Sequence, residues 1–226
     1  MKTSQVFIII LSIVILAVLY ATNVSLKKEY LKIDLENVYK NYVSVNSKPY
    51  SVLSISGSNG YPIEIFQNDT NTIKVLRSRL EHYKSTVKND TLFIEFSGSN
   101  VSMRQSFLTT TPPGIVIHKN KISGIVNSNT HQRVSGFKND HFNLVLKGNS
   151  HLELKNSKVK TLSVLTENDS QIQFLEHNTI DSLSLKMLNT SVANLTNINF
   201  KKVHPVLSDS IAIVVSKDTF KNLLKK

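Results

Sequence analysis

The chain has 226 residues, enough for one domain with a small appendage. It contains no cysteine, which excludes disulfide bonds, thiolate catalysis and cysteine-based zinc sites. Its 27 Lys and Arg residues outnumber its 16 Asp and Glu residues and give a formal net charge of +11. The lysines are scattered, without the recognition helix or aromatic motif of nucleic-acid readers. The favoured interpretation of the charge is a lysine-rich solvated surface. Attraction to anionic polymers or membrane surfaces fits it better than sequence reading, and no nucleic-acid partner is expected.

The first predicted element is an apolar N-terminal helix. No charged residue occurs from Thr3 to Leu26, and lysines flank this stretch on both sides. Roughly 20 apolar residues cross a hydrocarbon core about 30 Å thick. We predict that residues 1–26 form a membrane anchor or signal anchor, with residues 3–26 in the lipid bilayer.

A cleaved signal peptide is the alternative to an anchor. The candidate cut after Ala21 places Leu19 at the third position before the cleaved bond, where a small residue is preferred. The apolar run is also long for a signal peptide, so we favour an uncleaved anchor. Positive charge on both flanks leaves the orientation open. The strand-rich, cysteine-free remainder favours export of the C-terminal part.

Short strands follow the anchor. Residues 27–48 combine alternating and helical spacings and are predicted as a juxtamembrane linker or cap. Alternating apolar segments bounded by Gly, Asn, Asp and Ser then predict strands at 51–55, 63–66, 72–75, 91–96 and 115–117. The stretch from 100 to 113 ends in a Thr- and Pro-rich segment and is predicted to be an exposed loop.

The C-terminal half carries a repeat with a period of about 20 residues, a length typical of solenoid repeats. Ser150, Ser170 and Ser191 occupy equivalent positions of this repeat. Apolar residues recur eight and six positions before each serine and two and four positions after it: Phe142, Leu144, Leu152, Leu154, Leu162, Val164, Ile172, Phe174, Leu183, Leu185, Ala193 and Leu195. Short strands at such a fixed period indicate stacked β-coils, so the predicted fold is an all-β parallel β-helix.

The coils at the two ends of the repeat fit this frame less well. A coil anchored on Thr130 has Gly124 and Gln132 where apolar residues are expected. The last coil fits best when anchored on Asp209, which makes it shorter than the coils before it. Because a solenoid needs its open edge covered, residues 216–226 are predicted to form a short C-terminal helical cap.

Several segments resemble the bacterial auto-transporter adhesin head GIN domain family, also called domain of unknown function 2807. They are YSVLSISGSNGYPIEIFQND, NTIKVLRS, VKNDTLFIEFSG and the repeats GNSHLEL, NDSQIQF and LNTSVANL. The family's corners read Ser-Gly-Ser-Gly, whereas these read Gly-Asn-Ser, Asn-Asp-Ser and Asn-Thr-Ser. The resemblance covers residues 49–215. It implies a right-handed β-helix at a bacterial cell envelope, beside a membrane or lipoprotein anchor, without catalytic residues.

One column of side chains is a candidate site. His131 and His151 follow the equivalent positions Thr130 and Ser150, and Gln171 is the next equivalent. Strand spacing would stack the two imidazoles about 5 Å apart, where a third ligand could complete a metal site. A solvated surface ladder is the favoured interpretation. We therefore predict no metal, cofactor or catalytic residue.

The predicted function is a non-catalytic binding or adhesion-like role at the envelope. Many weak contacts along a coil face would bind a glycan or protein partner. The domain is expected at the inner membrane on its periplasmic side, with the cell surface as the alternative. A polysaccharide-processing enzyme would need clustered carboxylates and aromatics, but the acids are dispersed and Trp is absent. A structural or sensory partner that docks through an open coil edge is the third possibility.

Overall fold

The computed structural model of the protein describes residues 3–31, 38–57, 61–96 and 112–217. Its contacts divide the chain into a helical unit, Met1–Asn41, and a strand-rich unit, Tyr42–Lys226. The helical unit contains α1 (Thr3–Leu31), which is apolar and exposed on all sides. This helix is long and apolar enough to cross a membrane, which fits an anchor or a signal sequence. It ends at Leu31, beyond the predicted end of the anchor at Leu26.

The strand-rich unit contains two sheets and one 3-10 helix, η1 (Arg77–His82). The nine-stranded sheet contains, in spatial order, β1 (Tyr42–Val45), β4 (Thr72–Leu76), β7 (Ile115–Lys119), β3 (Ile63–Gln67), β9 (His131–Ser135), β11 (His151–Lys155), β13 (Gln171–Phe174), β15 (Val192–Leu195) and β17 (Ala212–Val215). The eight-stranded sheet contains β16 (Ile198–Leu207), β14 (Asn178–Met187), β12 (Lys158–Thr166), β10 (Lys138–Lys147), β8 (Gly124–Ser128), β2 (Val52–Ser56), β6 (Thr91–Phe96) and β5 (Tyr83–Lys88).

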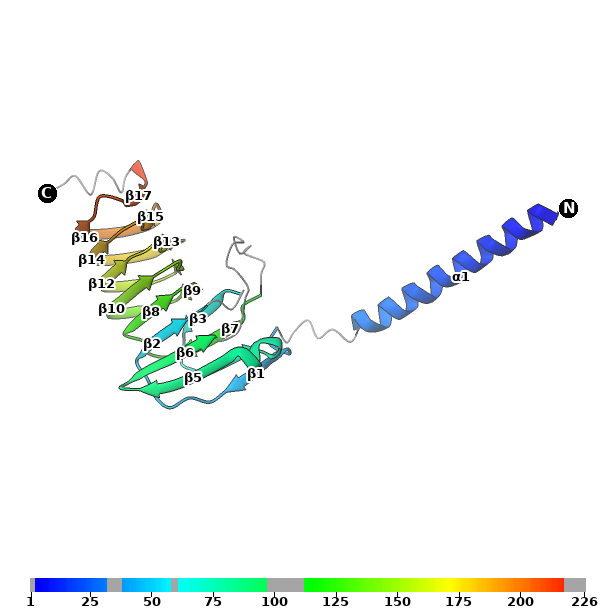
Figure 1. Cartoon of the computed structure of the whole chain (residues 1–226), viewed down its shortest axis with the longest axis horizontal. Helices are drawn as coiled ribbons and strands as arrows, with labels where there is room; N and C mark the ends of the chain where they lie inside the picture. Colours follow the sequence, from blue (N-terminus) through cyan, green and yellow to red (C-terminus); the bar gives the residue numbers. More distant parts are fainter. Residues whose placement is uncertain (1–2, 32–37, 58–60, 97–111, 218–226) are drawn as a thin grey trace. The chain divides into compact units, whose positions relative to one another are not determined.

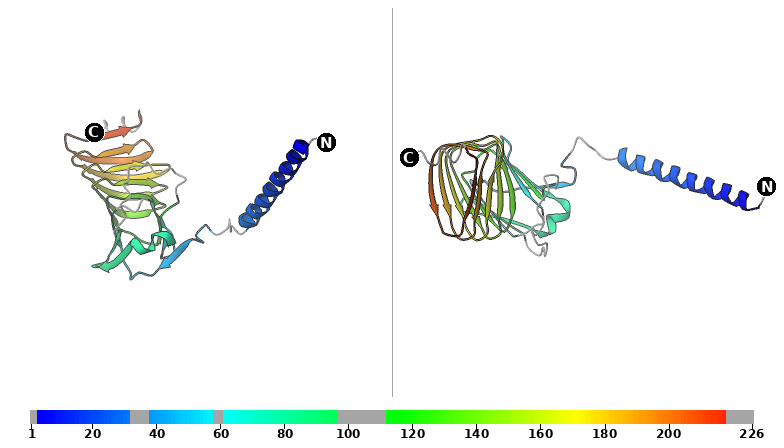
Figure 2. Two further views of the ribbon diagram at one scale, coloured as in Figure 1. Left: turned by 45° about the vertical axis from the view of Figure 1, so that its right-hand side comes forward. Right: turned by 90° about the horizontal axis from the view of Figure 1, so that it is seen from above.

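Strands β8 to β17 form a β-solenoid of about five turns, each turn giving one strand to each sheet. Figure 1 and the left view of Figure 2 show these turns stacked above one another. From β9 to β17 the nine-stranded sheet is parallel, and paired residues lie one repeat length apart in the sequence. The predicted parallel β-helix, with about 20 residues per turn, is confirmed.

The predicted inward positions form the core between the two sheets. All twelve apolar residues of the repeat are buried, and equivalent residues pair across neighbouring strands, as Phe142 with Leu162 and Leu162 with Leu183. Stacking like on like removes each side chain from water without a wide interior, because each turn covers the next. Phe137 adds a large ring that no repeat position predicts, stacked on Phe142 with centroids 4.9 Å apart.

The last turn has a different register from the one predicted. Ala193 pairs with Ile213, and Leu183 pairs with Val203, so the equivalent of Ser191 is Ile211 rather than Asp209. The last turn is therefore as long as the turns before it, not shorter. The alignment on Asp209 is wrong because it requires a polar residue at the turn, whereas the terminal turn has an isoleucine there.

In the first turn, the inward residue of β8 is one residue closer to the Thr130 position than its equivalent in the next turn is to Ser150. Leu144 pairs with Ile125, so Ile125 takes the inward position that the repeat assigns to Gly124. Gln132 remains an inward polar residue and is fully buried. Its Nε2 donates to the Thr130 hydroxyl at 3.3 Å, and that hydroxyl donates to Asn127. A small polar network therefore replaces apolar packing in this turn.

At the N-terminal end of the stack, some strands continue the parallel pairing and others form antiparallel pairs. β2 pairs in parallel with β8, and β3 pairs in parallel with β9. β1, β4 and β7 form antiparallel pairs, as do β5 and β6. The β5–β6 hairpin turns at Asn89 and Asp90, both with positive φ, as a type I′ turn requires. Residues 27–48, for which the sequence predicts a linker or cap, include the strand β1.

Two predicted segments lie largely outside the described residues. These are the exposed loop at 100–113 and the C-terminal cap at 216–226.

Candidate functional site

The predicted column of His131, His151 and Gln171 lies on β9, β11 and β13. The three residues are in register on adjacent strands. The two imidazoles meet edge to face, with ring centroids 4.6 Å apart and an interplanar angle of 64°. His131 is only 6% exposed, so the expected solvated ladder is not what the structure contains at this position. All five residues of β9 are buried, whereas β11 and β13 alternate between buried and half-buried residues.

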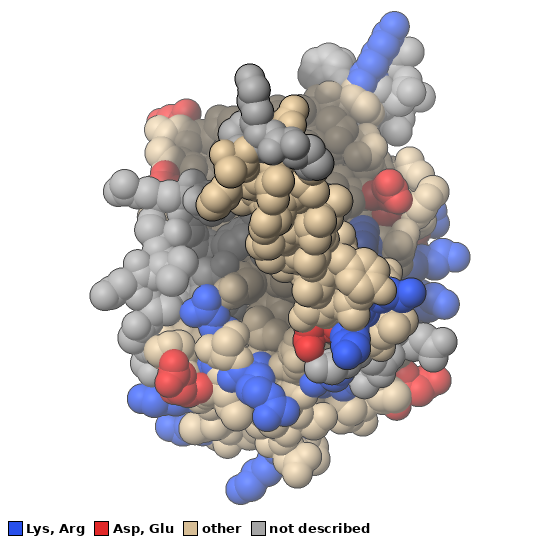
Figure 3. All heavy atoms as spheres, turned by 90° about the vertical axis from the view of Figure 1, so that its right-hand side faces the viewer, with Lys and Arg blue, Asp and Glu red and all other residues tan. Residues whose placement is uncertain are grey.

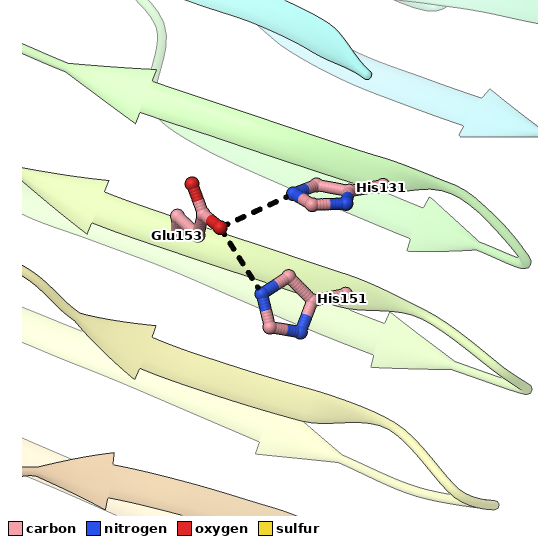
Figure 4. Close-up of side chains that lie close together, drawn as sticks. All are labelled: His131, His151 and Glu153. Atoms are coloured by element: carbon pink, nitrogen blue, oxygen red, sulfur yellow. Dashed lines mark ion pairs between the residues drawn. The ribbon is translucent and has the colours of Figure 1, made fainter. Parts of the chain in front are cut away.

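Glu153 joins the two histidines. Its side chain lies on the same face of β11 as His151, two positions away, and points between the rings (Figure 4). The Nε2 atoms of His131 and His151 are each 3.4 Å from the same carboxylate oxygen, Oε1. The ligand atoms of this trio all lie within 4.8 Å of one another. We call these three side chains the His–His–Glu cluster.

A second column of charged side chains holds the cluster's carboxylate. Glu64, Arg133 and Glu153 are in register on β3, β9 and β11. Arg133 places Nε 3.4 Å from Glu153 Oε2 and one terminal nitrogen 3.5 Å from Glu64 Oε1. Oε2 of Glu153 thus contacts the guanidinium, and Oε1 contacts the imidazoles. The arginine fixes which oxygen is presented to the histidines.

The electrostatics favour a neutral imidazole beside an ionised carboxylate. Burial lowers the pKa of His131, and this effect outweighs the attraction of Glu153. Burial would raise the pKa of Glu153, but hydrogen bonds and charge from His131 and His151 hold that pKa well below its usual range. At neutral pH, His131 is therefore neutral and Glu153 is charged.

The repeat reveals the histidine column but neither Glu153 nor Arg133. Side chains two positions apart on a strand share a face, so His-x-Arg at 131–133 and His-x-Glu at 151–153 contain the signal. Comparison of equivalent positions between turns finds the histidines. It does not find partners that lie two positions apart within one strand.

A hollow of about 720 Å³ lies where β10, β12 and β14 begin. Ile122 and Val159 contribute apolar surface, and the other lining side chains are polar or charged. Lys121, Lys138 and Lys158 are among them. Lys138 and Lys158 are direct partners in the β10–β12 register, so two ammonium-bearing side chains start from neighbouring strands. We call these three residues the lysine column.

The acidic residues beside the lysine column have partners of their own. Lys160 Nζ lies 2.7 Å from Asp140, and Lys201 Nζ lies 2.7 Å from Asp181. The register on either side aligns the four residues across β10, β12, β14 and β16, with alternating sign. This charge ladder is exposed, and the Asp140 carboxylate raises the pKa of Lys160.

The lysine column, in contrast, has a net positive charge. Within the described ranges, no ion pair joins Lys121, Lys138 or Lys158 to an acidic side chain. On the face shown in Figure 3, Lys and Arg side chains lie at several separate places among uncharged atoms. Lys138 and Lys158 differ from these scattered charges in being paired in register, and all three residues of the lysine column line the hollow.

The fold defines the protein as a β-solenoid that follows an apolar helix in the chain. No protein-family model matches the sequence, and no curated protein sequence matches it. A solved structure of a "putative adhesin" from Bacteroides fragilis aligns with a TM-score of 0.50 and 12% identity, over 77% of this chain and 93% of that chain. Another "putative adhesin", from Parabacteroides merdae, aligns with a TM-score of 0.45 and 11% identity, over 78% of this chain and 95% of that chain.

At this level of identity the likeness concerns the fold. The Bacteroides structure shows that this arrangement of strands recurs in a protein of unrelated sequence, and the match covers 93% of that chain. The resemblance to the GIN domain family stays a prediction.

Proposed function

We propose that the chain is a membrane-anchored, non-catalytic β-solenoid of the bacterial cell envelope that binds an acidic glycan through its lysine column. One observation carries this proposal. Lys138 and Lys158 start from adjacent strands in register, beside a hollow, while the neighbouring acids Asp140 and Asp181 are already paired. Like charges held at strand spacing repel each other, and an anionic ligand relieves that repulsion.

The shape and composition of the hollow fit a polymer with regularly spaced charges. Successive turns repeat the strand starts about 4.8 Å apart, so a ligand that follows the stack meets one turn after another. Each contact is weak, and many together give useful affinity. Carboxylate-bearing sugars supply the charge and the hydroxyl groups that the Ser, Thr and Asn side chains of the hollow can bind.

Binding to polygalacturonate tests the glycan proposal. The full chain in non-ionic detergent should bind this acidic polymer, and neutral dextran much more weakly. The double variant Lys138→Glu plus Lys158→Glu should weaken binding about tenfold or more, which corresponds to about 1.4 kcal/mol or more. Binding should also fall as salt is added, because exposed charges are screened. Biolayer interferometry at two salt concentrations measures both effects.

Lys202→Glu plus Lys186→Glu is the matched control, because both lysines are exposed on neighbouring strands away from the hollow. It changes the net charge equally and should affect binding much less. Equal losses in the two double variants would mean that net charge alone drives binding, and the lysine column would be rejected. Release of shortened products from the polymer would instead support the polysaccharide-processing alternative.

The envelope location is part of the same proposal. We propose residues 1–26 as an uncleaved anchor in the inner membrane, 27–48 as a linker or cap, 49–215 as the exported β-helix and 216–226 as its C-terminal cap. The apolar character of α1 supports the anchor. Stability without cysteine suits a domain held by packing and strand ladders alone.

Protease treatment of cells with a C-terminally tagged copy tests this location. We expect digestion of the tag only after the outer envelope is permeabilised, because the domain is proposed to face the periplasm. Digestion in intact cells would place it on the surface. Protection even after permeabilisation would place the domain on the cytoplasmic side of the inner membrane, and the proposed export would be wrong.

A further inference from the structure

We propose that the His–His–Glu cluster is a binding site for a divalent transition-metal ion, with Zn²⁺ as the ion that its donors suit. The cluster contributes two imidazole nitrogens and one carboxylate oxygen, from His131, His151 and Glu153. Such a set of three protein ligands with a remaining position for water is a recurring zinc arrangement. The proposal rests on a different part of the molecule from the lysine column and does not depend on glycan binding.

Two of the three distances between the donor atoms match those of a coordination site. Two ligands about 2.05 Å from a tetrahedral zinc ion lie about 3.3 Å apart. The two nitrogen-to-oxygen separations in the cluster are both 3.4 Å. The ligand atoms of the two histidines lie within 4.8 Å of each other, so rotation of side chains is enough to bring the three donors around one cation.

The arrangement is also held in place before any ion arrives. His131 and His151 are fixed by the register of β9 and β11, and Glu153 is fixed by Arg133 at its other oxygen. Carboxylates that bind metals commonly carry such a second contact, which orients them and tunes affinity. Arg133 brings positive charge close to the site, but it also contacts Glu64, whose carboxylate offsets that charge.

The surroundings of the cluster limit competition from water. The side chains of His131 and Glu153 are 7% and 17% exposed, and that of His151 is 24% exposed. An ion can thus reach the site beside His151 while most of the shell remains protein. Bound metal would join β9 to β11 by a second link besides their backbone hydrogen bonds. It would therefore stabilise the first turns of the solenoid.

Titration of the chelator-treated full chain with Zn²⁺ in detergent tests the site. Calorimetry should give one ion per chain, reversed by EDTA, and saturating Zn²⁺ should raise Tm by about 5 °C or more. Co²⁺ in place of Zn²⁺ should give the intense visible spectrum of a four- or five-coordinate ion. Absence of binding, or weak binding of several ions per chain with no rise in Tm, would overturn the proposal.

Three conservative variants assign the ligands. His131→Gln, His151→Gln and Glu153→Gln keep the side-chain shape approximately and should each weaken Zn²⁺ binding about 100-fold. His204→Gln is the control, because His204 is exposed on β16 and outside the cluster. A variant that binds as tightly as the unchanged chain would remove that residue from the proposed site. Circular dichroism of the metal-depleted variants checks that each still folds.

Discussion

Replacing Phe142 by alanine is expected to destabilise the protein by about 4 kcal/mol. Phe142 is fully buried at an inward position of the repeat, and its ring stacks on Phe137. Truncation removes the burial of a whole ring and leaves a cavity that neighbouring turns cannot fill, because strand ladders hold their backbones in place. A loss of this size is a large part of the roughly 5–15 kcal/mol that typically separates folded from unfolded protein.

Urea unfolding of the full chain in detergent, followed by the strand signal in circular dichroism, measures this loss. Phe93→Ala is the matched control, since Phe93 is also on a strand but is 43% exposed. It should cost less than about 1 kcal/mol. If both variants lost the same stability, the inward frame assigned to the repeat would be incorrect at Phe142.

Asn178→Ala should cost about 3 kcal/mol, although it removes few atoms. Asn178 is buried at the start of β14, and its amide group donates to the carbonyls of Leu154 and Leu175 at 2.9 and 2.7 Å. Its Oδ1 accepts from the backbone N–H of Ser157 at 3.2 Å. Alanine removes three hydrogen bonds, two of them buried and the one to Leu175 partly buried, and each costs about 1 kcal/mol.

Asn178→Asp separates hydrogen bonding from shape. A carboxylate still accepts from Ser157 but faces two carbonyl oxygens that it cannot donate to, so this variant should be at least as unstable as Asn178→Ala. Asn143→Ala, at an exposed position of β10, should change stability by less than about 0.5 kcal/mol. Thermal melts of the three variants, side by side, give the comparison. Near-wild-type stability of Asn178→Asp would contradict the donor role.

The repeat allowed much of the fold to be predicted. Equivalent apolar residues such as Leu144, Val164 and Leu185 point inward in the structure. Alternation along each strand and the repeat of about 20 residues between turns both assign these positions to the core. The hairpin of β5 and β6 could not be predicted in the same way. β5 consists of alternating half-buried and exposed residues, with no repeat partner to mark it.

The candidate sites were harder to predict, for a related reason. Asn178 and the lysine column depend on where a turn ends and the next strand begins, and apolar periodicity does not define such points. The His–His–Glu cluster depends on the choice of face. The repeat predicts that His131 and His151 lie side by side, but it does not mark Glu153, which shares a face of β11 with His151.

The alternating charge ladder of Asp140, Lys160, Asp181 and Lys201 restricts how the number of turns can change. Each residue lies beside a partner of opposite sign on the next strand. Loss of one internal turn would bring two residues of the same sign together, as Asp140 and Asp181, whereas loss of two turns would keep the alternation. During folding, a strand that pairs with the next strand but one would likewise place two charges of the same sign side by side. Loss of two turns therefore preserves the ladder, whereas loss of one turn replaces an exposed ion pair by a weak repulsion.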